Sequence, residues 1–286
     1  MMRGYYVDVG AWAPSSTVWT QAVDTLSDQE QQQIQRFVFT KDQRLALASR
    51  LLQRHLIHTT FEVPWKEIAI ERTLEGKPYW RRHDTTDRPC WNYNVSHHGT
   101  VVAIAAHPTQ LVGVDVMQLS ERPRGKRNEP NEFFRAFQDY FTPLEWEYIR
   151  RSSEPRQQFE SFYRLWSLKE SYIKAVGIGL GFELLRAEFA PVVSETTDVW
   201  HMRLDGVRAT QWQFESHDVE TAAEDPHVIS VALGPIAEMW KPELSSVLPH
   251  VPTSALASQS QSWSSEEQQV AWEAITLEQL IAQSTR

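Results

Sequence analysis

The sequence contains a single cysteine, Cys90, among its 286 residues. One cysteine excludes an intramolecular disulfide and any zinc site built from several cysteines. Apolar runs are also short, and none approaches the roughly 20 residues that a membrane-spanning helix requires. The first residues, MMRGYYVDVGAWAP, are too polar and aromatic for a secretory signal peptide. We therefore expect a cytoplasmic protein that does not associate with a membrane.

Positive charge is scarce as well. The chain has 28 lysines and arginines against 37 aspartates and glutamates, which gives a formal net charge of −9. Nonspecific binding to nucleic acid needs basic surface to neutralise phosphates, so we expect no nucleic-acid partner. The densest basic cluster, RPRGKR at residues 122–127, contains proline and glycine and is predicted to be an exposed loop.

Hydrophobic periodicity and turn residues predict a mixture of helices and strands. One helix begins at a capping box formed by Ser27 and Glu30, and another has Thr142 as its N-cap and Pro143 as its first residue. The other helices are expected at 42–58, 131–141 and 157–176. Strands are expected at 5–9, 68–72, 92–97, 101–108, 111–117, 188–192, 198–204, 211–214 and 227–233.

Two segments of the chain resemble each other. TVVAIAAHP (100–108) and HVISVALGP (227–235) are both apolar strands that end in proline, and a long helix precedes each of them. This repetition predicts an α+β fold with two pseudo-symmetric subdomains. We expect them at residues 1–118 and 119–240.

The composition changes after residue 240. Residues 252–265 are rich in serine and are expected to form a linker. The remaining residues have the pattern of a terminal helix that docks back on the body of the protein. The apolar side chains expected to dock are Trp272, Ile275, Leu277 and Leu280.

The segment WSLKESYIK (166–174) belongs to the longest predicted helix. One face of this helix carries apolar side chains expected in the core: Leu165, Leu168, Tyr172 and Val176. Another face carries Trp166, Glu170 and Lys174 at successive helical turns. Read alone, Glu170 and Lys174 are an ordinary exposed ion pair on a helix surface.

Asp115 changes this interpretation because it interrupts the apolar strand LVGVDVM (111–117). A carboxylate within such a strand is costly unless something compensates its charge. It shares a strand face with Gly113, a residue type that permits close approach of a ligand. Two readings remain: a structural aspartate bonded to a neighbouring loop, or, together with Glu170, a ligand of Mg²⁺.

The turn NVSHHG (94–99) can donate hydrogen bonds to phosphate through Ser96, His97 and backbone N–H groups. The same residues can simply cap a turn. No G-x-S-x-G sequence surrounds Ser96, which disfavours a serine hydrolase. Adjacent histidines in a strand point to opposite faces and make a poor zinc pair.

The segment ERTLEGKPYW (71–80) places Arg72 close to a Gly76–Lys77 turn. It lacks the first glycine and the Ser/Thr of a nucleotide-binding P-loop. Each of these motifs alone favours an ordinary structural role. Their joint order along the chain carries more information than any single motif.

In the order GKP, NVSHHG, VGVDVM and FYRLWSLKESYIKAVGIGL, the chain resembles the 4′-phosphopantetheinyl transferases across about residues 20–235. It is similar to the larger, monomeric type with two subdomains. The resemblance implies transfer of phosphopantetheine from coenzyme A (CoA) to a serine of a carrier domain, with Mg²⁺. Acyl, peptidyl and aminoadipate-reductase carriers are all implied partners, in lysine, polyketide or nonribosomal peptide biosynthesis.

The resemblance also implies roles for individual residues. Asp115 and Glu170 would bind Mg²⁺, and Glu170 and Lys174 would be the catalytic residues. The remaining contacts to CoA would come from Arg72, Gly76, Lys77, Asn94, Ser96, His97 and Lys169. Lys169 is also compatible with a solvated position beside the site.

Two positions depart from the family pattern. Met117 occupies the place of a third acidic metal ligand, so a water would fill that position. Gln33 occupies the place of a basic residue for the 3′-phosphate of CoA, and Arg36, Lys41 and Arg44 are alternatives. These departures are the features that favour a competing hypothesis, a carrier- or CoA-binding module without turnover.

Overall fold

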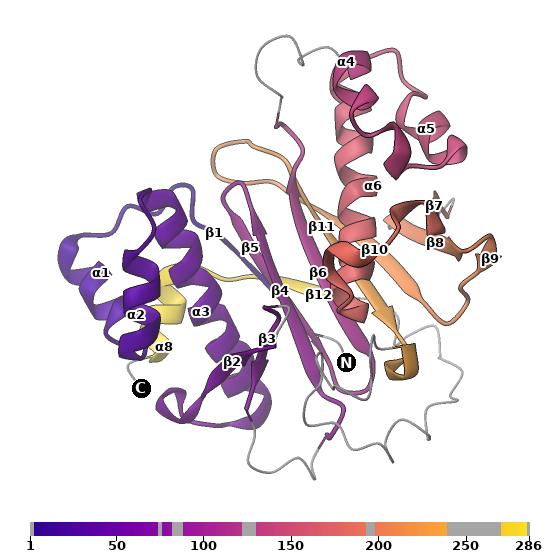
Figure 1. Cartoon of the computed structure of the whole chain (residues 1–286). Helices are drawn as coiled ribbons and strands as arrows, with labels where there is room; N and C mark the ends of the chain where they lie inside the picture. The colour runs from indigo at the N-terminus through magenta and orange to yellow at the C-terminus, as the bar shows by residue number, and fades with distance from the viewer. Residues whose placement is uncertain are drawn as a thin grey trace.

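The computed structural model describes residues 3–73, 76–81, 88–121, 130–192, 198–238 and 270–284. The predicted basic loop at 122–127 and the predicted linker at 252–265 lie outside these ranges. Within them, helices and strands form two halves, each with its own sheet and one long helix (Figure 1). The predicted α+β fold with two subdomains is confirmed.

The first half contains the four-stranded sheet β12-β1-β5-β4. Its helix α3 covers one face of this sheet and buries Leu45, Leu52 and Leu56. The elements are β1 (Arg3–Asp8), α1 (Ser16–Val23), α2 (Asp28–Gln35), α3 (Thr40–Phe61), η1 (Trp65–Glu67), β2 (Ile70–Arg72), β3 (Pro78–Trp80), β4 (Asn92–His98) and β5 (Val101–His107). Helix α1 was not predicted from the sequence.

The second half contains the sheet β6-β11-β10-β8-β7, with β9 paired to β8. Helix α6 packs against β6 and β11, and its predicted core residues Leu165, Leu168, Tyr172 and Val176 are buried. The elements are β6 (Leu111–Gln118), α4 (Pro130–Arg135), η3 (Gln138–Tyr140), α5 (Pro143–Ile149), α6 (Pro155–Val176), η4 (Gly179–Gly181), η5 (Leu184–Arg186), β7 (Ala187–Pro191), β8 (Asp198–Leu204), β9 (Val207–Arg208), β10 (Gln213–Val219), β11 (His227–Gly234) and η6 (Ile236–Glu238).

Local sequence explains the ends of several helices. The side chains of Ser27 and Thr142 accept from the backbone N–H groups three residues later, and Glu30 and Glu145 return the bond. The capping box of Ser27 and Glu30 was predicted, whereas for the other helix only the N-cap Thr142 was predicted. Helix α6 ends at Gly177, which has a φ of 75° that favours glycine. Among the described residues, no helix is both long enough and apolar enough to cross a bilayer.

The two sheets meet along β4 and β6. Alternate polar side chains of β4 accept hydrogen bonds from the backbone N–H groups of β6: Asn92 from Val112 (3.1 Å), Asn94 from Val114 (2.8 Å) and His98 from Gln118 (2.9 Å). These side chains satisfy donors on the edge of β6 that no strand of its own sheet uses. The position of β6 relative to β4 is therefore determined residue by residue.

Strand β6 pairs with β11, and this pairing shows to which half β6 belongs. The predicted boundary at residue 118 assigned β6 to the first half. In the structure the chain passes from one sheet to the other in the turn at residues 108–110, so β6 belongs to the second sheet.

The C-terminal segment returns to the first half. Strand β12 (Ala271–Ala274) runs parallel to β1, and α8 (Leu277–Ser284) packs on α3 and α1 (Figure 1). Ile275, Leu277 and Leu280 are buried there, whereas Trp272 is half-buried. The strand preceding this helix was not predicted.

The turn between the two sheets depends on a neutral histidine. His107 Nδ1 accepts from the backbone N–H groups of Thr109 (3.1 Å) and Gln110 (2.9 Å). A proton on Nδ1 would turn this acceptor into a donor that faces the N–H groups of Thr109 and Gln110. Burial lowers the pKa of His107 to about 4.

We expect His107→Asn to make stability less sensitive to acid. Between pH 6.5 and 4 the unfolded chain binds a proton at His107 that the folded chain does not, so stability falls as the pH falls, by at most about 1.4 kcal/mol per pH unit. Asparagine Oδ1 can accept the same two bonds without titrating. Urea unfolding at pH 7 and pH 5 should therefore show a smaller loss for the variant, and equal losses would contradict this role.

Candidate active site

The site lies where α6 crosses β6, and a glycine permits their close approach. A Cβ atom at Gly113 would lie 1.9 Å from the Ser171 carbonyl oxygen and 2.5 Å from the Ala175 backbone nitrogen. The sequence suggested that Gly113 makes room for a ligand. The structure shows instead that it makes room for the backbone of α6, the helix that carries Glu170 and Lys174.

Gly113→Ala is expected to destabilise the protein by about 1–3 kcal/mol, because backbone atoms rather than flexible side chains must move. It should also lower activity, since α6 would shift away from β6. Gly181→Ala is a matched control, because a Cβ at Gly181 meets nothing within 4 Å. Unfolding in urea measures both effects, and similar midpoints for the two variants would contradict the steric argument.

Three side chains from three elements converge at this crossing. Lys174 Nζ on α6 donates to Asp115 Oδ1 on β6 at 2.6 Å and to Ser96 Oγ on β4 at 2.9 Å. Ser96 Oγ lies 3.3 Å from the same Asp115 oxygen. Asp115 and Ser96 are buried. The charge on this buried aspartate is therefore compensated by Lys174.

Glu170 lies beside this group, one helical turn before Lys174. Burial raises the pKa of its carboxyl, the negative charge of Asp115 raises it further, and Lys174 acts in the opposite direction. The negative charge of Asp115 therefore acts on the carboxyl of Glu170. Two neighbouring carboxylates repel each other, and a bound cation would remove this repulsion.

The donor set fits a hard divalent cation. Asp115 Oδ2 is buried and has no hydrogen-bond partner among the described residues. Carboxylate oxygens are the ligands that Mg²⁺ prefers, and one or two of them commonly suffice when substrate phosphates complete the shell. Across the described parts of the chain, no group of three or more His, Cys, Asp or Glu residues could hold a metal. Met117 packs against the core of the second half.

The hairpin β2–β3 brings the side chain of Lys77 next to this cluster. Lys77 Nζ donates to the backbone oxygens of Val112 (3.3 Å) and Lys174 (3.2 Å). Burial lowers the pKa of Lys77 to about 7. Arg72 is exposed and donates to the Gly76 carbonyl at 2.7 Å, and Gly76 has a φ of +87°. Lys77 thus lies at the crossing of β6 and α6.

His97 follows Ser96 on β4 and is exposed. Desolvation, and after it the positive charge of Lys174, lowers the pKa of its imidazole. Asn94 is in a different position. Its side-chain oxygen accepts from Val114 N, so it joins the two sheets and does not extend into the cluster.

Lys169 lies away from the cluster, despite its position next to Glu170 in the sequence. It is only 1% exposed, and its ammonium forms an ion pair with the fully buried Glu145 at 3.0 Å. The same ammonium donates to the carbonyls of Leu184 and Ala187. This geometry supports neither a contact with CoA nor a solvated position, and it joins α6 to α5 and to the start of β7.

Glu145 is the partner that the sequence interpretation missed. One use of its carboxylate is local, because it accepts from Thr142 N in the capping box of α5. The second use, with Phe189 N and Lys169, joins positions far apart in the chain, and no local pattern indicates it.

Comparisons with known proteins agree with this arrangement. Residues 10–109 match the family model for the N-terminal part of 4′-phosphopantetheinyl transferases, and residues 111–232 match the model of the 4′-phosphopantetheinyl transferase superfamily. The two matches meet at the turn where the chain passes between the sheets.

Three similar proteins are 36–39% identical to this chain over the aligned residues. An L-aminoadipate-semialdehyde dehydrogenase-phosphopantetheinyl transferase of Xenopus laevis is 39% identical over 79% of the chain and 74% of the relative. The protein of the same name in Homo sapiens is 38% identical over 78% and 72%. A phosphopantetheinyl transferase of Thraustochytrium is 36% identical over 81% and 78%. The chain belongs to the 4′-phosphopantetheinyl transferase superfamily.

Proposed function

We propose that this protein transfers the 4′-phosphopantetheine group of CoA to a serine hydroxyl of an apo carrier domain, and that Asp115 and Glu170 bind the Mg²⁺ required. Membership of the superfamily supports the reaction. The single structural observation that carries the assignment of the site is the pair of carboxylates beside Lys174, of which Asp115 is buried and Glu170 half-buried, with one oxygen of Asp115 that has no hydrogen-bond partner among the described residues.

The chemistry suits these residue types. The serine oxygen attacks the phosphorus that bears the pantetheine arm, a new P–O bond forms, and the P–O bond to the leaving nucleotide breaks. The nucleotide leaves as adenosine 3′,5′-bisphosphate. Such a reaction depends mainly on positioning and on stabilisation of charge. A Mg²⁺ ion held by the two carboxylates would supply positive charge at the pyrophosphate.

Glu170 has the properties of a general base in this scheme. Its carboxyl lies in partly desolvated surroundings, which make it a stronger proton acceptor than an ordinary surface glutamate. It would accept the serine proton, directly or through a water molecule. Lys174 would donate to the phosphate oxygens that gain charge, and Ser96 and His97 would donate to the same pyrophosphate.

The partners follow from the reaction. The names of two relatives refer to aminoadipate-semialdehyde dehydrogenase, which supports the carrier domain of a similar aminoadipate reductase as one acceptor. Acyl and peptidyl carrier domains present the same serine chemistry and are included in the proposal. We further propose a monomeric, cytoplasmic enzyme, on the composition and family resemblance described above.

A mass measurement tests the proposed function. Purified apo carrier domain, CoA and MgCl₂ are incubated with the protein, and the carrier is expected to gain about 340 Da, the mass of the phosphopantetheine group. Omission of Mg²⁺ with added EDTA should abolish the gain. If acyl, peptidyl and aminoadipate-reductase carriers all remain unmodified across a range of Mg²⁺ concentrations, the protein is a binding module and the proposal is wrong.

A further inference from the structure

The hairpin β2–β3 belongs to the first half, but its residue Lys77 extends a side chain to the second half. The backbone of Lys77 is fixed within the hairpin, because its carbonyl accepts from Thr73 N (2.9 Å) and its N–H donates to Thr73 Oγ1 (3.2 Å). Arg72 closes the same turn through its bond to the carbonyl of Gly76. The point from which the Lys77 side chain starts is therefore well defined.

The Lys77 ammonium ends at two backbone carbonyls of the second half. Its Nζ donates to Val112 O on β6 at 3.3 Å and to Lys174 O on α6 at 3.2 Å. The N–H of Val112 is bonded as well, to the side chain of Asn92 on β4 at 3.1 Å. Both backbone polar groups of Val112 thus have partners from the first half, and Lys77 adds α6 to this junction.

The carbonyl of Lys174 lies in the last turn of α6, which ends at Gly177. Carbonyls in the last turn of a helix lack partners within the helix and lie at the negative end of its dipole, where a cation is favourable. The carbonyl of Ile173 accepts from Gly177 N at 2.9 Å, and the next carbonyl, that of Lys174, accepts from Lys77. Lys77 thus caps α6 from a distant part of the chain.

Packing alone does not account for a lysine at this position. Within the described residues Lys77 forms no ion pair, and burial lowers its pKa to about 7. An ammonium whose partners are carbonyls alone is costly to bury, and an apolar side chain of similar length would avoid that cost. This cost indicates a role beyond filling space between the two halves.

Lys174 connects the junction with the Asp115 cluster. Its carbonyl accepts from Lys77, and its own ammonium donates to Asp115 Oδ1 (2.6 Å) and to Ser96 Oγ (2.9 Å). A displacement of the backbone at Lys174 would move this ammonium away from both partners. Gly113 permits the close approach of α6 to β6, and Lys77 bonds to both elements at the same crossing.

We propose that Lys77 is a positioning residue, which holds the last turn of α6 on β6 and thereby fixes the Lys174 ammonium beside Asp115 and Ser96. This inference rests on the proposed function, in which Lys174 donates to the transferring phosphate. Lys77 acts through Lys174 and touches no reacting atom.

Steady-state kinetics of Lys77→Met separates positioning from binding. We expect kcat for transfer to a carrier domain to fall by about 10- to 100-fold, because a misplacement of about 1 Å in a catalytic group costs up to this factor. The KM for CoA, and its Kd from calorimetric titration, should stay within about threefold of wild type. Lys77→Arg keeps a cation with several donors, and its kcat should be about fivefold or more above that of Lys77→Met. An unchanged kcat with a raised Kd for CoA would make Lys77 a direct ligand of CoA and overturn the inference.

A double-mutant cycle with Lys174 tests the route of the effect. If Lys77 acts through Lys174, Lys77→Met should lower kcat by less than about twofold in a protein that already carries Lys174→Met. Mass measurement of the carrier domain over long incubations detects the slow transfer expected of these variants. Equal losses in the two backgrounds would show that Lys77 acts independently of Lys174, which contradicts the proposal.

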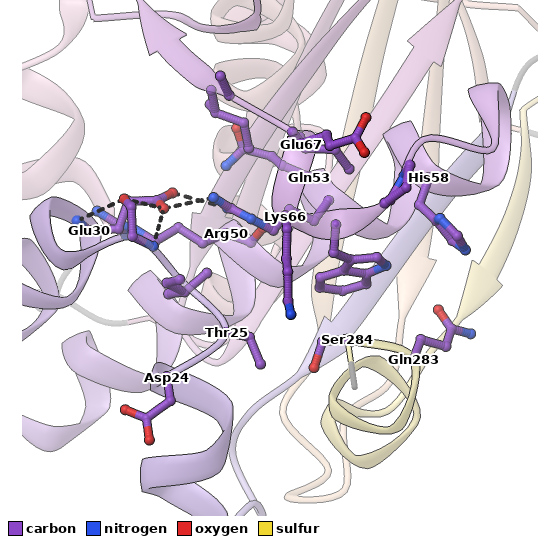
Figure 2. Close-up of a pocket in the computed structure, with 18 of the residues that line it drawn as sticks. Asp24, Thr25, Glu30, Arg50, Gln53, His58, Lys66, Glu67, Gln283 and Ser284 are labelled. Carbon is purple, nitrogen blue, oxygen red and sulfur yellow. Dashed lines mark hydrogen bonds and ion pairs between the residues drawn. The ribbon is translucent and has the colours of Figure 1, made fainter. Parts of the chain in front are cut away.

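Hydrogen exchange gives a reading that needs no turnover. In Lys77→Met the backbone amides of residues 174–177 should exchange faster, whereas those of α3 should be unchanged. Lys66→Met is the matched control, because Lys66 is an exposed lysine of the same half that points into the pocket lined by α1, α3 and α8 (Figure 2). It should alter neither the exchange nor kcat. Unchanged exchange at residues 174–177 in Lys77→Met would overturn the inference.

The two proposals fail in different ways. Absence of transfer by the wild-type protein would refute the proposed function, and hydrogen exchange would still decide whether Lys77 holds α6. Transfer by the wild-type protein, with an equal kcat in Lys77→Met, would support the function and refute the positioning role.

Discussion

Replacement of Lys169 by methionine is expected to destabilise the protein by about 3–5 kcal/mol, because it leaves the carboxylate of Glu145 buried without its cation. Glu145 is fully buried, and its remaining partners are the backbone N–H groups of Thr142 and Phe189. Burial raises the pKa of Glu145 and lowers the pKa of Lys169, so each charge depends on the other. Urea unfolding at pH 7 measures the loss.

A second substitution separates the charge from the packing. Glu145→Gln removes the negative charge and keeps an acceptor for one of the two backbone N–H groups, which bond to different oxygens of the carboxylate. The double variant Glu145→Gln/Lys169→Met should therefore be more stable than Lys169→Met alone, although two residues are changed. A double variant that is at least as unstable as Lys169→Met would contradict the argument from an unpaired charge.

The matched control lies on the same helix. Arg156 and Glu160 form an exposed ion pair at 2.7 Å, one turn apart on α6. Arg156→Met should change the free energy of unfolding by no more than about 0.5 kcal/mol, because exposed pairs contribute little. Comparable losses for Arg156→Met and Lys169→Met would show that burial of the pair is not what matters.

Lys169 also shows where interpretation of the sequence reached its limit. The motif WSLKESYIK correctly placed Glu170 and Lys174 on one face and the apolar residues on another, because helical periodicity is a local property. The partner of Lys169 is Glu145, 24 positions earlier, and only the packing of α5 against α6 brings them together. No sequence pattern indicates that a lysine and a glutamate at that separation form an ion pair.

Strands, too, were predicted where their own residues indicate them and missed where a distant partner decides. The apolar stretches of β5, β6 and β11 were predicted because their composition alone indicates burial. Strand β12 was missed because AWEA has no apolar run of its own, and its partner β1 lies at the other end of the chain. The side-chain bonds that join β4 to β6 were likewise invisible, since Asn92 and Asn94 look like ordinary polar strand residues.

The family motifs predicted that Asp115, Glu170 and Lys174 belong to one site. The structure places these residues where α6 crosses β6. Their roles in catalysis are a proposal. Gly113 was correctly singled out for close approach, although the group that approaches is helix α6 rather than a ligand.

Glu170→Gln is expected to lower kcat for transfer to a carrier domain by about 10²- to 10⁴-fold, the range typical of a lost general acid–base group. The substitution preserves shape and removes one of two neighbouring negative charges. Since burial and Asp115 both disfavour the ionised form of Glu170 in the folded protein, the variant should be no less stable than wild type. Loss of activity without loss of stability distinguishes a functional carboxylate from a structural one.

Mg²⁺ provides a second, independent measurement. In the presence of CoA, millimolar MgCl₂ should raise the Tm of the wild-type protein, because a ligand that binds only the folded state stabilises it. The increase should be much smaller in Glu170→Gln and in Asp115→Asn, which each lack one carboxylate. Glu160→Gln, on the same helix but in the exposed pair with Arg156, should keep both the activity and the increase. If Glu170→Gln lost activity and kept the full increase in Tm, Glu170 would be a base that does not bind the metal.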